Sequence, residues 1–372
     1  MSSWPFSLTL GSLFPKKVSK LNEPKRRKSE AKCRRIAVEE HFSTVEHLDL
    51  LRAILEKTYP DLKVVEEERF IASDAPFLPI SSTPPVREML DSLLDIGEGR
   101  LRAMNQFGID MQVLSFVSPG VQVFDAASGT RMAKKVNNKL SKVVNEYPAR
   151  FAGLASLALQ NPDEAADELE RSVKELDLKG ACICTHTKGE YPDGKKYRVI
   201  FQRAHQLEAP IYLHPRGPSP AMIRPYLDYP FLDSAMLGFA AEAGLSAMRL
   251  ICSGLFDEYP KLKIILGHLG EAIPFWLSRI DNFWKRGPLS MTLKKTPSQY
   301  FKDNFFVTTS GMFSEPAFKC TLSILGADHI LFAVDYPMES PEEAIKFMEE
   351  APIDHSDKER IYHLNAEKVF SL

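Results

Sequence analysis

The sequence predicts an α/β fold in which eight parallel strands, each followed by a helix, close into a (β/α)8 or TIM barrel. From residue 35 onward, short apolar segments alternate with helix-like segments and recur about every 30 to 65 residues, as βα units do. Eight units fit a closed barrel better than an open doubly wound sheet. No Gly-x-Gly-x-x-Gly or phosphate-binding loop follows the first strand, which argues against a nucleotide domain. The predicted strands are residues 35–38, 109–116, 151–157, 179–184, 210–213, 262–266, 305–308 and 330–334.

The helix starts between these strands carry clear signals. At one of them Asn161 is expected to cap the helix, Pro162 takes the first helical position, and acidic residues fill the first turn. Two stretches look irregular. Residues 43–100 predict an insertion after the first strand, and residues 215–230, with five prolines, predict an ordered loop after the fifth. Both follow strands, so both are expected on the face where barrels hold their active sites.

Composition restricts the classes of function. The chain is 44% hydrophobic and 26% charged, its net charge is −2, and its apolar runs are shorter than the roughly 20 residues that span a bilayer. These values argue against nucleic acid or a membrane as a partner. The five cysteines form no Cys-x-x-Cys pair, which suits packing roles in a reducing, cytoplasmic compartment.

Residues 1–34 differ from the rest of the chain. They hold nine Lys and Arg against two Glu and show no sustained amphipathic period, so they predict a basic, disordered extension ahead of a barrel domain over residues 35–372. Three interpretations remain open for this extension: a plain solvated tail, a cleaved organelle presequence, and a nuclear signal at residues 24–28.

Polar residues stand where the predicted strands end. Glu39 and His41 alternate onto one face of the first strand, His214 ends the fifth, and Asp335 closes the apolar run of the eighth. Taken singly, each has an ordinary explanation as a helix cap or a satisfied core residue. Together, carboxylates and imidazoles at one barrel mouth are the ligands that a divalent transition metal such as zinc or manganese prefers. The sequence therefore predicts one metal site.

The sixth strand supplies a further pair. Residues 264–266 form an apolar segment that stops at Gly267 and delivers His268 and Glu271 into a turn at the start of a helix. These two side chains could simply satisfy each other at the helix start. Because the other strand ends carry ligand-type residues, an acid/base role is the competing interpretation.

Several motifs carry a resemblance to a known family. They are Glu39-x-His41, Tyr212-Leu-His-Pro-Arg216, the segment 267–276 beginning Gly-His-Leu-Gly-Glu, and Leu331-Phe-Ala-Val-Asp-Tyr-Pro337. In combination they resemble the metal-dependent decarboxylases of the amidohydrolase superfamily, which include the γ-resorcylate, 2,3-dihydroxybenzoate, 5-carboxyvanillate and aminocarboxymuconate semialdehyde decarboxylases. The resemblance extends from about residue 35 to the C-terminus.

The resemblance implies roles for individual residues. It implies one divalent ion (Zn²⁺, Mn²⁺ or Mg²⁺), no organic cofactor and a small aromatic carboxylate as substrate. Residues 185–191 most resemble the 5-carboxyvanillate branch, in which the position of His186 lies near the substrate. The implied residues are Glu39, His41, His214 and Asp335 for the metal, Asp335, His268 and Glu271 for catalysis, and His186, Arg216 and Tyr336 for substrate binding.

The implied reaction is loss of CO₂ from an ortho-hydroxybenzoate. Asp335 would protonate the ring carbon that carries the carboxylate, and His268, held by Glu271, would set the protonation of the substrate hydroxyl. A hydrolase of a lactone, amide or ester on the same barrel is the alternative. Many hydrolytic relatives add a bridging lysine at a strand end, and no predicted strand ends in Lys. A barrel that only binds would show gaps among these residues, and there are none.

Self-association is also expected. Phe275, Trp276 and Leu277 follow one another just after the His268 turn, and three consecutive large apolar groups exceed what one buried helix stripe accommodates. Together with the resemblance, this predicts a homodimer or homotetramer.

Overall fold

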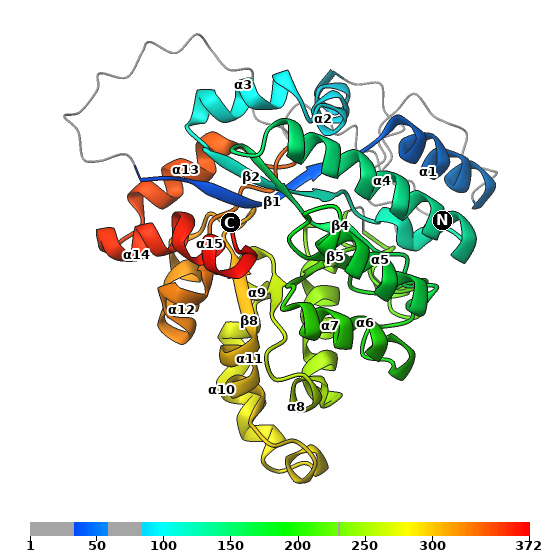
Figure 1. The fold of residues 1–372 in the computed structure, drawn as a ribbon. Helices are drawn as coiled ribbons and strands as arrows, with labels where there is room; N and C mark the ends of the chain where they lie inside the picture. Colours follow the sequence, from blue (N-terminus) through cyan, green and yellow to red (C-terminus); the bar gives the residue numbers. More distant parts are fainter. Residues whose placement is uncertain (1–32, 59–83, 230) are drawn as a thin grey trace, which may run out of the picture.

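The barrel strands are short and all pair in parallel (Figure 1). The structure is a computed structural model, and it describes residues 33–58, 84–229 and 231–372. Its hydrogen-bonded sheets have the strand orders β1-β2-β3 and β4-β5-β6-β7-β8-β9. The strands are β1 (Ile36–Phe42), β2 (Met111–Phe116), β3 (Phe151–Gly153), β4 (Ala155–Ser156), β5 (Ala181–Cys184), β6 (Ile211–His214), β7 (Ile264–Leu266), β8 (Phe305–Thr308) and β9 (Ile330–Leu331).

Backbone hydrogen bonds link the two sheets on both sides. β3 and β4 are one predicted strand interrupted at Leu154, whose N–H donates to the Leu114 carbonyl on β2 at 2.9 Å. On the other side, the Val38 N–H of β1 donates to the carbonyl of Phe332, just past β9, at 3.1 Å. The strands therefore occupy eight positions around one ring, and the predicted α/β barrel is confirmed.

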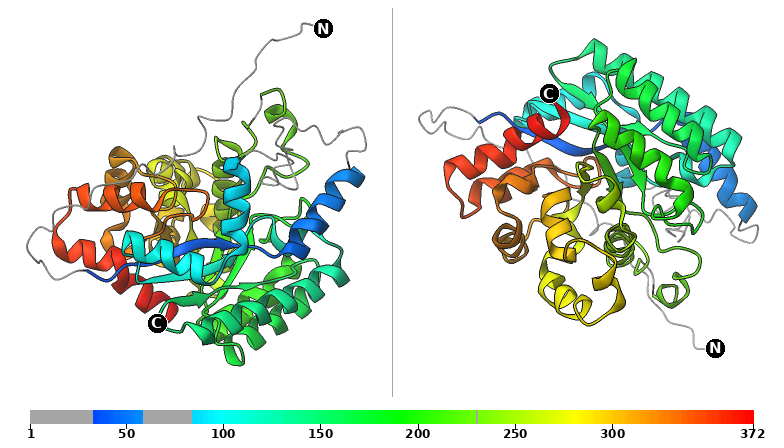
Figure 2. Two further views of the ribbon diagram at one scale, coloured as in Figure 1. Left: turned by 90° about the horizontal axis from the view of Figure 1, so that it is seen from above. Right: turned by 60° about the horizontal axis from the view of Figure 1, so that its bottom comes forward.

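Two apolar layers follow from the alternation of side chains along the strands. One layer fills the inside of the ring, where Ile36, Val38, Val113 and Ile265 pack together with Phe370 from the C-terminal helix α15 (Asn365–Phe370). The other layer packs the outer face of the strands against the surrounding helices, and Figure 2 shows these helices around the strands. α15 thus covers the end of the ring opposite the strand ends that carry the polar residues.

The stretch 43–100 contains more regular structure than predicted. Its described parts are the helices α1 (Val45–Thr58), α2 (Pro84–Leu94) and the start of α3 (Glu98–Phe107), and residues 59–83 lie outside the described residues. Val86, Met89 and Leu93 recur at helical spacing and are buried, so a single apolar face defines α2. The prediction of an irregular segment was wrong for these three helices.

The remaining helices surround the sheet (Figure 2). They are α4 (Ala126–Glu146), α5 (Pro162–Lys174), α6 (Arg198–Leu207), α7 (Gly238–Cys252), α8 (Leu255–Glu258), α9 (His268–Glu271), α10 (Ile273–Trp284), α11 (Pro297–Asn304), α12 (Glu315–Leu325), α13 (Pro341–Glu350) and α14 (His355–Glu359), with a π-helical turn, η7 (Arg360–Leu364), before α15. None of the described helices is long and apolar enough to cross a membrane.

Helix α5 begins where predicted but is capped differently. Asn161 occupies the N-cap position, yet its side chain makes no capping hydrogen bond. Pro162 and the acidic Asp163 and Glu164 of the first turn remain as the local signals. The predicted cap by the Asn161 side chain was therefore wrong. The predicted basic extension lies outside the described residues except for Cys33 and Arg34.

Candidate metal centre

β1 separates its three terminal acidic and imidazole side chains onto two faces. The register of β1 against β2 shifts between Ala37 and Glu40, which marks a bulge that re-aims side chains. Glu40 accepts hydrogen bonds from Gln112 Nε2 at 3.0 Å and from the Val334 N–H at 2.9 Å, and burial raises its pKa well above the ordinary range. Glu40 is thus a buried structural residue, whereas Glu39 and His41 face the centre of the barrel mouth.

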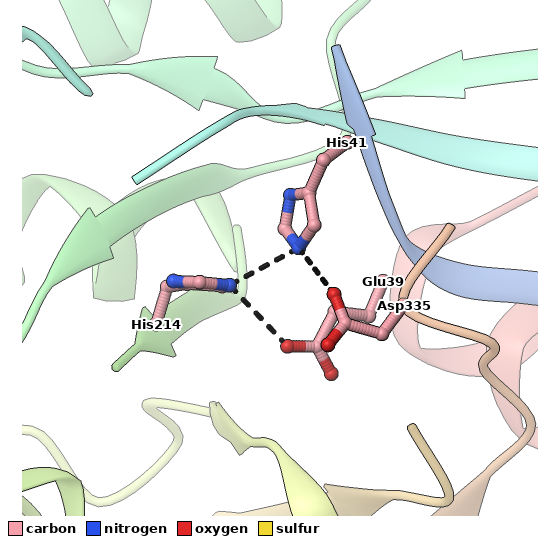
Figure 3. A group of neighbouring side chains, drawn as sticks. All are labelled: Glu39, His41, His214 and Asp335. Carbon is pink, nitrogen blue, oxygen red and sulfur yellow. Dashed lines mark hydrogen bonds and ion pairs between the residues drawn. The ribbon is translucent and has the colours of Figure 1, made fainter. Parts of the chain in front are cut away.

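Four side chains converge from three strand ends (Figure 3). Glu39, His41, His214 and Asp335 each present one ligand atom, and these atoms all lie within 4.8 Å of one another. His41 Nε2 lies 3.1 Å from Asp335 Oδ1 and 3.1 Å from His214 Nε2, and His214 Nε2 lies 3.4 Å from Glu39 Oε1. The structure therefore brings together the four residues predicted to hold a metal.

Each ligand atom is oriented by a second contact of the same side chain. His214 Nδ1 donates to the Pro215 carbonyl at 2.7 Å. Since burial, with a further contribution from His41, lowers the pKa of His214 to about 4, its ring is neutral at pH 7 and Nε2 presents a lone pair to the centre. His41 Nδ1 contacts Ser115 Oγ at 3.0 Å, which fixes that ring in the same way.

Glu39 shows most directly that the residues suit a cation. Its Oε2 accepts hydrogen bonds from Thr308 Oγ1 at 3.0 Å and from Ser310 Oγ. Its Oε1 is buried and has no hydrogen-bond partner, although a buried carboxylate oxygen is costly to leave unpaired. That oxygen faces the neutral imidazole of His214. A divalent ion would satisfy both, and a mixed set of imidazoles and carboxylates matches zinc or manganese.

Asp335 connects this centre to a second pair. Its Oδ1 faces His41, and its Oδ2 lies 3.7 Å from His268 Nε2. Burial would raise the pKa of Asp335, but the hydrogen bonds to His268 and His41 outweigh it and hold that pKa well below its usual value. His268 Nδ1 lies 2.7 Å from Glu271 Oε1. Burial opposes protonation of His268, but the charges of Glu271 and Glu39 raise its pKa well above the ordinary value.

The backbone around the two pairs is held in an unusual conformation. Residues 268–272 all have positive φ, from 50° at His268 to 85° at Gly270, and Asp335 has φ 78°. Non-glycine residues in this region store strain and cluster at functional sites. The turn is supported by the His268 N–H, which donates to Ser310 Oγ at 3.3 Å. The sequence predicted a helix start here but not this run of left-handed residues.

The predicted substrate residues occupy two places. His186 is fully buried; Nε2 donates to the Gly217 carbonyl at 3.0 Å and Nδ1 accepts from the Gly189 N–H at 3.1 Å. Burial, aided by Arg216, lowers the pKa of His186 to about 3. Arg216, also fully buried, donates to the His186 carbonyl at 3.2 Å. Tyr336 directly follows Asp335, and the Arg100 guanidinium lies 4.9 Å from its ring centre.

Several residues that support the centre were not predicted from the sequence. Ser115, Thr308 and Ser310 contact His41 or Glu39, and hydroxyl residues at the ends of otherwise apolar strands were the available signal. The Glu339 side chain borders the same space as the His268 ring. A Cβ atom placed on Gly311, between them, would lie 3.2 Å from the His268 ring and 3.6 Å from the Glu339 side chain. Burial, with repulsion from Asp335, raises the pKa of Glu339 to about 7.

A parallel barrel with one Glu, two His and one Asp facing a common point defines a class of enzymes that bind a single metal at the strand ends. This chain belongs to the Amidohydrolase family, whose model matches residues 47–372. The predicted resemblance to the metal-dependent decarboxylases of the amidohydrolase superfamily is confirmed by the individual relatives.

Three relatives illustrate the similarity. A γ-resorcylate decarboxylase of Polaromonas sp. strain JS666 is 35% identical over 91% of this chain and 98% of its own length. A crystal structure of 5-carboxyvanillate decarboxylase from Sphingomonas paucimobilis is 36% identical with a TM-score of 0.83, covering 92% and 100% of the two chains. The Novosphingobium aromaticivorans 5-carboxyvanillate decarboxylase, complexed with manganese and 4-hydroxy-3-methoxy-5-nitrobenzoic acid, is 35% identical with a TM-score of 0.84, covering 91% and 96%.

Proposed function

We propose that this protein catalyses the metal-dependent, non-oxidative decarboxylation of an aromatic acid with a hydroxyl group ortho to the carboxylate. The relatives named for decarboxylation of γ-resorcylate and 5-carboxyvanillate support this substrate class. The observation that carries the proposal is the position of Asp335, which has one oxygen at the candidate metal centre and the other facing His268. One carboxyl group there can contact both the bound substrate and a proton source.

The metal would be held by Glu39, His41, His214 and Asp335. When bound, it supplies a positive charge that orients the carboxylate and ortho-oxygen of the substrate and stabilises the negative charge that develops on them. The unpaired oxygen of Glu39 and the lone pair of His214 support this assignment. Manganese in a relative of the same fold supports Mn²⁺ as the first ion to test.

Asp335 is proposed to deliver the proton to the ring carbon. Its low pKa means that the free enzyme holds it ionised, so it must take a proton from the substrate hydroxyl or water when substrate binds. The new C–H bond uses the ring π electrons, and the ring regains them when the C–C bond to the carboxylate breaks and CO₂ leaves. The number of protons is conserved, because the one that Asp335 gives up replaces the carboxylate on the ring.

His268 and Glu271 are proposed to set the protonation of the substrate hydroxyl. The short contact between His268 Nδ1 and Glu271 fixes the ring and leaves Nε2 facing the site. Arg216 and Tyr336 are proposed to bind the substrate. His186 is proposed to act with them by holding the two loops on either side of its ring, since both its nitrogens bond to the backbone.

The Asp335→Asn variant tests this proposal. Asn keeps an oxygen for the metal but cannot donate a carboxyl proton, so CO₂ release from γ-resorcylate or 5-carboxyvanillate should fall by at least about 10²–10⁴-fold. Substrate binding, measured by calorimetry on the manganese-loaded protein, should persist. CO₂ release at a near wild-type rate would overturn the role of Asp335, and no CO₂ from any ortho-hydroxybenzoate would overturn the function.

We also propose that the protein forms a homodimer or homotetramer and is located in the cytoplasm. On α10, Phe275, Trp276 and Phe283 are 74%, 49% and 51% exposed, which is unusual for a surface that faces only water. Leu277, predicted to belong to the same apolar group, packs into the core. All five cysteines are free thiols, which supports a reducing compartment.

A further inference from the structure

A second group of metal-ligand side chains lies away from the barrel mouth. Cys33 precedes β1 by three residues, Glu359 ends α14, and His363 lies in the π-helical turn η7. The start of β1 and α14 lie side by side in Figures 1 and 2. Glu39 is the middle residue of β1 and His41 lies near its far end, so the strand separates this group from the candidate catalytic centre.

The spacing of the three side chains suits one ion. One ligand atom from each of Cys33, Glu359 and His363 lies within 4.8 Å of the others. Ligand atoms around a tetrahedral zinc ion, bound at 2.0–2.3 Å, are about 3.5 Å apart, so the group needs to close by only about 1 Å. Glu359 and His363 are four residues apart on consecutive helical turns, which places both side chains on one face.

The surroundings favour a cation over an anion. Burial, together with the carboxylates of Glu359, Glu349 and Asp110, raises the pKa of the Cys33 thiol above its ordinary value, while the guanidinium of Arg35 lowers it. A metal ion that binds the thiolate must therefore displace the thiol proton. Glu367 Oε1 lies 3.3 Å from His363 Nδ1 and so orients the imidazole, as carboxylates do in many zinc sites. The same oxygen accepts from Arg34 Nη1 at 2.6 Å, and Glu359 Oε2 lies 3.5 Å from His355 Nδ1. The Cys33 thiol is not in a disulfide, and its hydrogen bond to the Arg34 carbonyl is weak at 3.5 Å.

We propose that Cys33, Glu359 and His363 form a second metal site, which binds zinc and plays a structural part. All three side chains are partly exposed, so water completes the tetrahedral shell. A thiolate, a carboxylate and an imidazole are zinc ligands, and the thiolate distinguishes this site from the barrel centre, where the four converging residues include no cysteine. A bound ion would tie the chain just ahead of β1 to the helices that lead into α15.

Cobalt provides a selective probe because a cobalt–thiolate bond gives a near-ultraviolet charge-transfer band that imidazole and carboxylate ligands do not give. We expect the manganese-loaded full-length protein, titrated with Co²⁺, to develop this band and to saturate it at about one Co²⁺ per chain. The band would report the second site even where Co²⁺ also replaces manganese at the barrel centre. Added Zn²⁺ should abolish the band by competition.

Variants identify the ligands. Cys33→Ser should lose the band completely, and His363→Ala should weaken Co²⁺ binding at least about tenfold. Cys320→Ser is the matched control, because Cys320 is also a free, partly buried thiol but lies on α12, and it should keep the band. CO₂ release should be unchanged in all three variants.

Three results would overturn the site: no charge-transfer band in the wild-type chain, a band that survives Cys33→Ser, or unaltered Co²⁺ affinity in His363→Ala. The proposed decarboxylase activity is independent of this outcome. Absence of CO₂ release with the band present would leave the second site standing and reject the catalytic proposal alone.

Discussion

At the scale of single residues, the candidate catalytic centre is defined by side chains with one atom tied to the protein and another turned to a common point. His214 Nδ1 donates a hydrogen bond to the Pro215 carbonyl, and Nε2 of the same ring faces His41. Glu39 Oε2 accepts hydrogen bonds from two hydroxyl groups, whereas its Oε1 is buried without a hydrogen-bond partner. Such a division fixes the geometry of the ligands before any ion binds, and the hydroxyl residues are the groups that orient Glu39.

The first prediction concerns His214. Replacing His214 by Ala removes one of four ligand side chains, so the manganese content of the purified protein should fall from about one ion per chain to less than about one tenth, in line with the 10–100-fold or larger affinity losses seen around metal sites. Metal content is measured by elemental analysis after dialysis. His205→Ala is the control, because His205 lies on α6 and belongs to neither group of candidate metal ligands. Manganese retained in His214→Ala would remove His214 from the site.

The second prediction is a dependence of stability on pH that comes from His47. His47 is fully buried, with Nδ1 at 2.9 Å from Ser43 Oγ, and burial lowers its pKa to about 3. In the unfolded chain its pKa is about 6.5, so between these values the unfolded state binds more protons and stability falls as pH falls, by about 1.4 kcal/mol per pH unit. The loss stops below the folded-state pKa.

Urea unfolding at pH 7.5 and pH 5 measures this effect. In His47→Gln, which retains hydrogen-bonding groups but does not titrate, the difference in unfolding free energy between the two pH values should be smaller than in the wild type by about 2 kcal/mol. The same difference in both proteins would show that His47 does not titrate with folding.

At the scale of secondary-structure elements, α3 supports the end of β1. Arg100 on α3 is fully buried; its Nη2 donates to the His41 carbonyl at 2.6 Å and its Nε to the Asp95 carbonyl at 2.8 Å. The same guanidinium lies over the ring of Tyr336, and its charge acts on the buried Glu40. The helix that ends the predicted insertion therefore holds two segments of the candidate site in place.

The third prediction tests this support. Arg100→Met keeps the length of the side chain but removes the donor to the His41 and Asp95 carbonyls and the buried positive charge that acts on Glu40, so the unfolding free energy should fall by about 3–5 kcal/mol. Arg102→Met is the matched control, because Arg102 lies on the same helix with its side chain 73% exposed, and it should change stability by less than about 0.5 kcal/mol. Equal effects in the two variants would contradict a supporting role for Arg100.

The sequence was informative about elements where one local pattern decides the structure. The alternation of Glu39, Glu40 and His41 predicted the two faces of β1, and the apolar run before His268 predicted β7. The contacts of Arg100 and Ser310 could not be predicted, because their partners come from distant parts of the chain and hydrogen-bond partners leave no periodic signal. The break at Leu154 was missed for a similar reason, since strand pairing rather than local apolar content separates β3 from β4.

At the scale of the whole molecule, the two ends of the ring of strands differ, with polar candidate site residues at one end and apolar packing at the other. The candidate catalytic groups stand at the carboxyl ends of the strands, and α15 covers the opposite end with apolar side chains. The order of elements around the ring was predictable because each βα unit repeats one local rule. The exposed apolar side chains on the outer helices were harder to predict, because their exposure depends on which helix faces other elements leave uncovered.

The fourth prediction concerns self-association through α10. Phe275→Glu places a charge on a ring that is 74% exposed, so it should leave the fold intact while weakening association at least about tenfold, because a charge would have to be buried in an apolar interface. Sedimentation at micromolar concentration measures this. Val45→Glu is the control, since Val45 is 62% exposed on α1. A wild-type protein that is monomeric at that concentration would contradict the proposal.

The fate of one proton and of solvent oxygen distinguishes a decarboxylase from a hydrolase. The wild-type, manganese-loaded protein would be incubated with γ-resorcylate or 5-carboxyvanillate in D₂O and, separately, in ¹⁸O-labelled water, and the product analysed by NMR and mass spectrometry. If Asp335 passes an exchangeable proton to the ring, the product must carry one deuterium at the carbon that held the carboxylate and no solvent oxygen. A product that carries solvent oxygen without ring deuterium would identify a hydrolase and contradict the decarboxylase proposed here.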